Sequence, residues 1–403
     1  MKIKTNLMML LMLPALSVSA EDPTLLDAVR GGTPALNLRL RAEYGDEDGK
    51  ESSTALTART RLAYTTAPWE GLSAGLEFEA TRAADTDDYN AAGVTGNPDK
   101  TVIADPPSTE LNQLFLRYTR GDITGVVGRQ RLVLDNARFV GDVGWRQNNQ
   151  TYDAVTLTFA PTEDLTLLYG YIDGVNRIFG SKSEGAQRRL DSESHIVNLR
   201  YSGLPVGTIG VYGYLLDFDN AAALSSDTFG VYLDGRVATG EGNAVAYRFE
   251  AATQRDNSAS ATEGDALYLA ASGAYHFGPS LIGIGYERLE ADVGEDSSFT
   301  FSTPLATLHA FNGWADKFLA TPANGLEDVH VRASTLLTGD LRFTAVHHWF
   351  AATETSDTYG RELNLLLVKP LGSATLIAKY ANYRADELAT DTERLTLEIN
   401  FAF

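Results

Sequence analysis

Histidine offers the widest chemistry in this chain, because cysteine is absent from its 403 residues. Without cysteine there is no disulfide, no thiolate metal site and no thiol nucleophile. The histidines are His195, His276, His309, His330, His347 and His348. None has an HExxH or other metal-ligand spacing, and no GxSxG elbow, P-loop or dinucleotide fingerprint occurs. Local motifs therefore predict no enzyme, no metal site and no cofactor.

Arginine is the other residue type whose spacing suggests chemistry. Arg39 and Arg41 flank Leu40, and Arg59 and Arg61 repeat this spacing. Alternate residues of an extended chain share one face, and a guanidinium binds a carboxylate through two parallel hydrogen bonds. The cations on the polar face of such segments are Arg39, Arg41, Arg59, Arg61, Arg117, Arg129, Arg131, Arg200, Arg236, Arg248, Arg332, Arg342, Lys379 and Arg394.

Carboxylates on the same polar face are fewer, and the face is therefore predicted to be basic. They are Glu43, Glu77, Glu79, Asp234, Glu250, Glu287, Glu362 and Glu398. The parity is ambiguous around Gly128 and Ile284. The whole chain nevertheless has a net charge of −20, which argues against a nucleic-acid partner.

The segments that carry these residues alternate apolar and polar positions with period 2, which is typical of strands with two different faces. About eighteen such segments can be counted. Only residues 25–29 have helical spacing. The segments start near residues 35, 54, 72, 112, 123, 152, 164, 195, 207, 228, 244, 266, 280, 328, 340, 359, 373 and 392.

The connections between these segments are alternately short and long. Short ones, such as residues 119–122 and 239–243, contain the Gly, Asn and Asp of tight turns, whereas residues 84–111 and 290–327 are long. This alternation is typical of a transmembrane barrel, in which closure satisfies every backbone group in lipid. Aromatic residues at strand ends would form its girdle: Tyr44, Tyr64, Trp69, Tyr118 and Tyr201. We therefore predict an all-β fold, a transmembrane antiparallel up-and-down β-barrel, with a secreted soluble β-rich protein as the alternative.

The N-terminus indicates the compartment. Lys2 and Lys4 precede a short apolar run, and small residues lead to Ala20. The run is too short to cross a bilayer, so it is interpreted as a signal peptide. We expect residues 1–20 to be removed after Ala20, residues 21–34 to form a short periplasmic segment, and residues 35–403 to form a barrel in the outer membrane of a Gram-negative cell.

Three groups of segments resemble the alginate-export family of outer-membrane porins. They are TLLDAVR at 24–30 with LRLRAEY at 38–44; GRQR at 128–131, LDNARFVG at 134–141, WRQN at 145–148 and TYDAV at 151–155; and FNGWADKFL at 311–319, TP at 321–322 and GLED at 325–328. The resemblance implies a monomeric barrel of 18 strands and a passive channel for an anionic polysaccharide or its fragments. The last strand, which ends on Phe403, resembles the signal that barrel-assembly machinery recognises.

Two long loops mix aromatic and charged residues, as a path for sugar rings would require. A loop folded into the barrel would also narrow it, so these residues are expected at a constriction. They are Arg138, Trp145 and Arg146 in the first loop, and Phe311, Trp314, Asp316 and Lys317 in the second.

Together these patterns predict an outer-membrane porin for carboxylated saccharides or organic acids, with the basic face lining its lumen. Outer-membrane lipid, lipopolysaccharide and the barrel-assembly machinery are the other expected partners. A structural or adhesin-type barrel stays an alternative. An outer-membrane hydrolase with a site assembled across strands is a further one.

Overall fold

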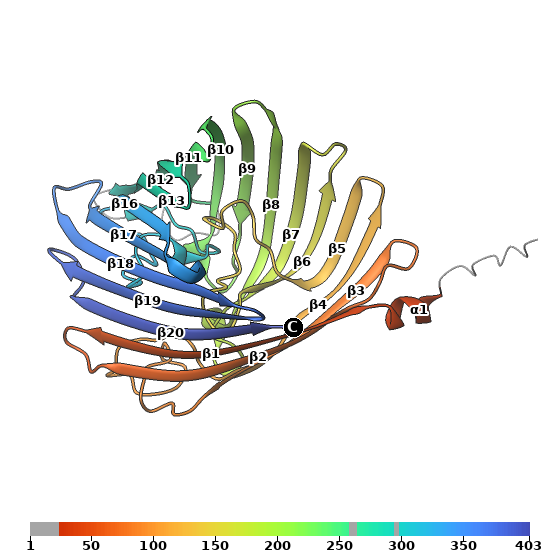
Figure 1. Cartoon of the computed structure of the whole chain (residues 1–403), viewed down its shortest axis with the longest axis horizontal. Coiled ribbons are helices and arrows are strands. Elements are labelled where there is room, and N and C mark those ends of the chain that lie inside the picture. Colours follow the sequence, from red (N-terminus) through yellow and green to blue (C-terminus); the bar gives the residue numbers. More distant parts are fainter. Residues whose placement is uncertain (1–23, 258–263, 294–297) are drawn as a thin grey trace, which may run out of the picture.

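The computed structural model describes residues 24–257, 264–293 and 298–403, and the signal peptide expected at residues 1–20 lies outside them. An 18-stranded antiparallel sheet closes on itself as a barrel (Figure 1). Its strands are β1 (Thr33–Glu47), β2 (Ser53–Thr65), β3 (Leu72–Ala83), β4 (Ser108–Arg120), β5 (Ile123–Gln130), β6 (Thr151–Phe159), β7 (Leu165–Asn176), β8 (Arg189–Leu204), β9 (Gly207–Leu216), β10 (Ser226–Gly240), β11 (Asn243–Arg255), β12 (Asp265–Phe277), β13 (Ser280–Leu289), β16 (Leu326–Leu336), β17 (Arg342–Ala351), β18 (Thr358–Leu371), β19 (Ala374–Ala385) and β20 (Thr392–Ala402).

The remaining elements are short. They are α1 (Leu25–Arg30), α2 (Gly185–Arg188), three 3₁₀ turns (Ala222–Leu224, Leu308–Ala310 and Thr338–Asp340) and the hairpin of β14 (Ala291–Val293) with β15 (Ser298–Thr300). Thr24 caps α1, because its side chain accepts a hydrogen bond from the Asp27 backbone. No helix among the described residues is long and apolar enough to cross a membrane.

The predicted fold class and strand number are confirmed. Predicted strand starts agree with the observed ones within two residues, except for β4 and β8, which begin earlier. The first six residues of β8, RLDSES, include only one large apolar side chain, so period-2 hydrophobicity cannot reveal them. Backbone pairing extends β8 there, with Arg189 opposite Asn176 of β7.

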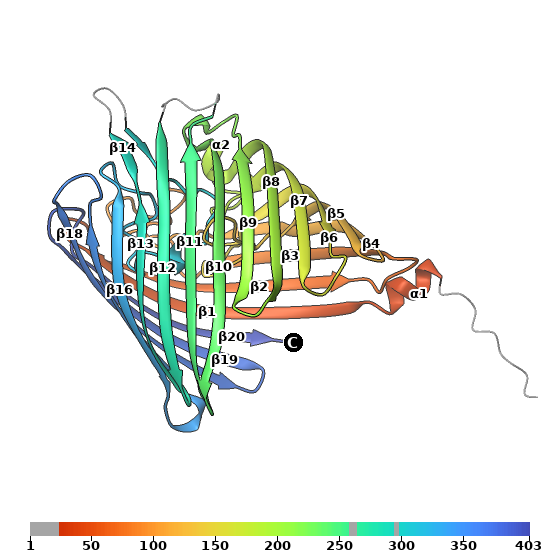
Figure 2. The ribbon, with the colours of Figure 1, turned by 90° about the horizontal axis from the view of Figure 1, so that it is seen from above.

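The barrel closes between its first and last strands. β1 pairs with β2 on one side and with β20 on the other. The backbones of Leu36 and Phe403 exchange hydrogen bonds of 2.9 and 3.1 Å, so both strands of this seam start or finish at the same end of the barrel. The short turns lie at that end, and the long loops lie at the opposite end (Figure 2).

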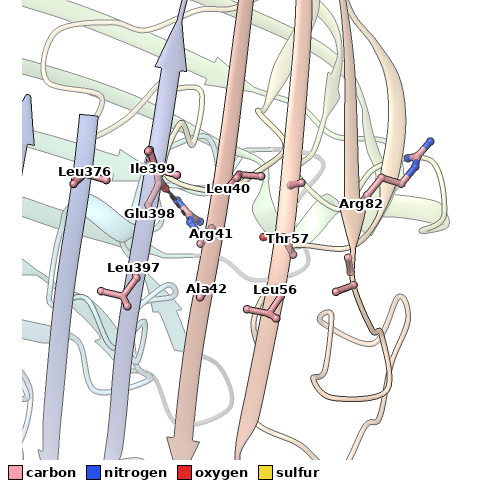
Figure 3. Close-up of a pocket in the computed structure, with 13 residues that line it drawn as sticks. Leu40, Arg41, Ala42, Leu56, Thr57, Arg82, Leu376, Leu397, Glu398 and Ile399 are labelled. Carbon is pink, nitrogen blue, oxygen red and sulfur yellow. Dashed lines mark hydrogen bonds and ion pairs between the residues drawn. The ribbon is translucent and has the colours of Figure 1, made fainter. Parts of the chain in front are cut away.

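The alternation along each strand separates two faces of the wall. On β1, Leu40 is 52% exposed on the outside, whereas Arg41 is 3% exposed inside. Figure 3 shows the outer face at this point, where small and aliphatic side chains such as Ala42 and Leu56 line a shallow depression. Arg41 and Glu398 point to the other side of the sheet, where they meet.

Three loops from the long-loop end fold into the barrel. We name them inner loop 1 (residues 84–107), inner loop 2 (residues 131–150) and inner loop 3 (residues 301–325). Loops 2 and 3 meet through a backbone bridge between Val140 and Leu305. Apolar side chains of these two loops, including Phe139 and Phe318, pack with inward side chains of the wall in one buried cluster. The interior of the barrel is therefore a packed core on its long-loop side.

Candidate functional site in the barrel lumen

Inner loop 2 is held against the seam by a lattice of buried charges. Arg41 of β1 lies 2.6 Å from Glu398 of β20 and 3.1 Å from Asp105 of inner loop 1. Arg146 of inner loop 2 lies 3.3 Å from Glu43. Each buried charge has an opposite partner, which offsets the desolvation that burial costs.

Inner loop 3 joins the same lattice. Asp316 lies 2.6 Å from Arg146, and Lys317 lies 3.1 Å from Glu47 of β1. Arg394 of β20 donates a hydrogen bond of 3.0 Å to the carbonyl oxygen of Ala315. The seam strands therefore anchor both loops.

An aromatic and basic cluster lies beside this lattice. Lys379 Nζ of β19 lies 4.0 Å from the ring centroids of both Trp145 and Trp314, at cation–π distance. The ring of His309 stacks on Trp145 with centroids 4.8 Å apart. Lys379 lies 2.5 Å from His309 Nε2, and Asp316 lies 2.6 Å from His309 Nδ1.

Burial determines the ionisation of this cluster. It lowers the pKa of His309 to about 3, even though Asp316 opposes the shift. Burial alone would raise the pKa of Asp316, but contact with His309 and the charge of Arg146 hold it well below its usual range. His309 is therefore neutral near pH 7, with its Nδ1–H donated to the Asp316 carboxylate.

Arg138 holds the other side of the loop core. Its guanidinium lies 2.7 Å from Glu287 of β13 and donates a hydrogen bond of 2.9 Å to Thr303. It also lies 4.9 Å from the ring centroid of Phe311. All seven residues predicted at a loop constriction thus lie in inner loops 2 and 3, where contacts with the wall or between the loops hold them.

Several arginines predicted on the lumen face do point inward, but their guanidinium groups already bind carbonyl or carboxylate oxygens of the protein. Arg39 donates to the carbonyl oxygens of Gly144 and Arg146, and Arg59 to that of Gln147. Arg61 pairs with Glu79, and Arg131 with Glu77 at 2.5 Å. These arginines bind the wall and its inner loops.

The prediction for Arg129 was wrong, because this side chain lies on the outer face. It is paired across the sheet with Leu114, which is 51% exposed, and its guanidinium lies 2.7 Å from Asp153. The odd positions of β5, such as Val127, face outward, and Arg129 continues that row. Arg131 turns inward because β5 ends at Gln130.

Six cations of the predicted lumen set remain accessible on the inner face. Among the described residues no ion pair is found for five of them: Arg117, Arg200, Arg236, Arg332 and Arg342. All five are exposed and lie near the short-turn ends of their strands. The sixth, Arg248, pairs with Glu250 at 2.9 Å and Asp234 at 3.2 Å. The short-turn half of the lumen therefore carries unneutralised positive charge.

A cavity of about 320 Å³ joins this basic region to the inner loops. Arg248, Arg332 and small wall residues such as Ser272 and Gly285 line one side of it. Phe311 and Trp314 line the other. The cavity thus combines aromatic faces from inner loop 3 with guanidinium groups from the wall.

Sequence patterns missed five residues that take part in these interior contacts. Asp105 belongs to a loop with no distinctive motif, and His309 and Asn312 were not selected within inner loop 3. Asp328 and His348 meet at 2.8 Å only because β16 and β17 are neighbours. The spacing Asp-x-His at residues 328–330 places both side chains on one face of a strand, and this was the only signal in the sequence. Their partner His348 could be identified only from the register between β16 and β17.

Comparisons with solved structures show that the barrel shares its fold with several crystal structures at low sequence identity. OccAB4 of Acinetobacter baumannii superposes with a TM-score of 0.70 at 14% identity, over 92% of this chain and 98% of that one. OccK9 (OpdG) of Pseudomonas aeruginosa gives 0.71 at 16% identity, over 93% and 100%. The outer membrane protein opdK of the same organism gives 0.69 at 14% identity, over 92% and 98%.

No curated protein sequence matches the chain. The family model for alginate export matches residues 33–402, which is nearly the whole barrel. With its closed 18-stranded wall and inward-folded loops, the chain belongs to the alginate-export family.

Proposed function

We propose that this porin is a passive channel for anionic solutes, and that carboxylated saccharides or organic acids are its cargo. One observation carries the proposal: five exposed inward arginines of the short-turn half have no carboxylate partner among the described residues. An arginine without a carboxylate partner forms no salt bridge that could stabilise the wall. In a narrow lumen they attract anions and lower the barrier to their entry.

The contacts of the acidic side chains on the inner wall also support a preference for anions. Glu43, Glu77 and Glu398 each contact an arginine, and Asp234 contacts Arg248. Their charge is therefore largely neutralised, although the whole chain is strongly acidic. The field that a solute meets in the short-turn half is accordingly positive.

The saccharide part of the proposal rests on the cavity at the inner loops. Phe311 and Trp314 present aromatic surface to it, and Arg248 and Arg332 present guanidinium groups. A sugar ring has an apolar face that packs on aromatic rings, and a uronate adds the carboxylate that arginine binds in bidentate fashion. We also propose that the channel acts as a monomer in lipid and lipopolysaccharide, inserted by barrel-assembly machinery.

Ion selectivity in a planar bilayer tests the proposal. Under a salt gradient we expect the reversal potential of an anion-preferring pore, and partial block of the current by uronate oligomers. The combined change Arg332→Gln with Arg342→Gln should reduce the anion preference. Arg361→Gln combined with Arg384→Gln, which removes the same two charges from the outer face of β18 and β19, is the matched control. Cation preference of the unmodified channel would refute the proposal.

A further inference from the structure

Two histidines and an aspartate meet on the inner face of β16 and β17. His330 and His348 are directly opposite each other in the sheet, and Asp328 lies two positions from His330 on the same face. Asp328 Oδ1 lies 2.8 Å from His348 Nδ1 and 3.7 Å from His330 Nδ1. One ligand atom from each residue lies within 4.8 Å of the other two.

We propose that Asp328, His330 and His348 form a binding site for a divalent transition-metal ion of the Zn²⁺ type in the lumen. The ligand set is two imidazoles and one carboxylate, which Zn²⁺ and Fe²⁺ both accept. Zinc bonds of about 2.0–2.2 Å place tetrahedral ligand atoms about 3.3 Å apart. The contacts of Asp328 with the two rings, at 2.8 and 3.7 Å, lie on either side of that value.

The charge balance around the site favours a cation. Glu287, Asp328 and Glu362 are all buried on this part of the inner wall. Arg138 pairs with Glu287, and the backbone N–H of Ala315 donates to Glu362 at 2.9 Å. Within the described residues, no Lys or Arg forms an ion pair with Asp328. Among the described residues, the charged partners of Asp328 are therefore limited to the imidazoles of His330 and His348, which are charged only when protonated. Burial of a carboxylate is unfavourable unless a positive charge offsets it, so a cation between Asp328 and the two neutral imidazoles would stabilise this cluster.

Neighbouring groups also suit a metal site. Asn312 Nδ2 donates to Asp328 Oδ2 at 3.2 Å and so orients the carboxylate from outside the ligand set. His330 Nδ1 is buried and has no hydrogen-bond partner among the described residues, which leaves it free to bind an ion. The three ligands line the cavity of about 320 Å³, which provides an entry route and room for exchangeable water ligands.

Metal titration of the folded, full-length protein in detergent, after treatment with a chelator, tests the site. We expect calorimetry to show saturable binding of one Zn²⁺ ion per chain. The absorption spectrum of bound Co²⁺ should indicate a low coordination number of the ion. His330→Gln and His348→Gln should abolish both signals. Asn312→Ala should weaken binding about 10–100-fold, as loss of a group that orients a ligand does elsewhere.

Two histidines provide matched controls. His276→Gln changes an inward residue of β12, and His347→Gln changes an outward residue of β17, and neither should alter binding. Circular dichroism should confirm folding of each variant; His330, whose side chain is 30% exposed, is the substitution that disturbs packing least. If Zn²⁺ and Co²⁺ bind nowhere saturably, or bind His330→Gln as well as they bind the control variants, the proposal is overturned.

Discussion

Arg146 Nη2 of inner loop 2 lies 2.6 Å from Asp316 Oδ2 of inner loop 3, and this ion pair joins the two loops in the middle of the barrel. Both side chains are buried. The pair also connects to the wall, because Arg146 contacts Glu43 of β1. Wall and loops thus form one continuous charged network.

Replacement of Arg146 tests how much that network stabilises the fold. Arg146→Met should lower the free energy of unfolding by about 3–5 kcal/mol, because Glu43 and Asp316 lose their shared cation in a buried setting. Urea unfolding in detergent measures this. The control Arg189→Met removes a cation from exposed ion pairs of β8 and should cost about 0–1 kcal/mol. Equal effects of the two substitutions would contradict a structural role for the network.

Lys379 should control how firmly both loops are held. Lys379→Met removes the cation that contacts Trp145 and Trp314, so the loops should dock more loosely. We expect faster proteolysis within inner loops 2 and 3, and larger or noisier single-channel currents. Lys369→Met on β18 is the matched control and should leave both measurements unchanged. Wild-type currents in Lys379→Met would show that this contact does not hold the loops.

Inner loop 3 should narrow the pore. Replacing residues 311–322 with a short Gly-Ser linker removes the side chains of Phe311, Trp314 and Asp316 from the lumen while leaving β16 intact. Single-channel conductance should rise, because the wall alone encloses a wider space. Insertion of the same Gly-Ser linker into the short turn at residues 241–242 serves as the control. Unchanged conductance after the replacement would exclude a constricting role.

His309 predicts how stability depends on pH. Its pKa in the folded state is about 3, below the value of 6.5 in an unfolded chain, because burial disfavours the charged ring. The unfolded chain therefore binds a proton first as pH falls, and stability should be lost between about pH 6.5 and 3, at up to about 1.4 kcal/mol per pH unit from this group. His309→Gln should flatten that part of the stability profile. An unchanged slope would mean that other groups cause the acid sensitivity.

The wall could be predicted from sequence because each strand repeats one local physical constraint. A residue such as Leu40 must face lipid and its neighbour Arg41 must not, so hydrophobicity alone reveals strand number, faces and turns. Where side chains no longer alternate between lipid and lumen, strand boundaries and faces could not be predicted from hydrophobicity. Beyond the lipid-facing part, β8 begins with polar residues, and Arg129 follows a row whose parity is hard to assign next to Gly128.

The interior could not be derived in this way. Contacts such as Arg138 with Glu287 depend on how long loops return into the lumen, which no periodic pattern encodes. The meeting of His330 with His348 depends on the register of two strands, and an offset of one residue would send one ring to the opposite face. Residue types therefore indicated which side chains matter, while their partners required the three-dimensional arrangement.

The seam between β1 and β20 has a consequence for the order of assembly. Arg41 on the first strand and Glu398 on the last become neighbours only when these strands pair. The same two strands supply Glu43 and Arg394, which fasten the inner loops. The part of the docking surface that the seam supplies consequently does not exist in an unclosed sheet, although Glu287 of β13 and Lys379 of β19 also contact the loops. Firm docking of the interior should therefore follow the meeting of the first and last strands. In a nascent barrel the inner loops would then be held only in part, and the final backbone pairing would complete both the wall and the packing of its interior.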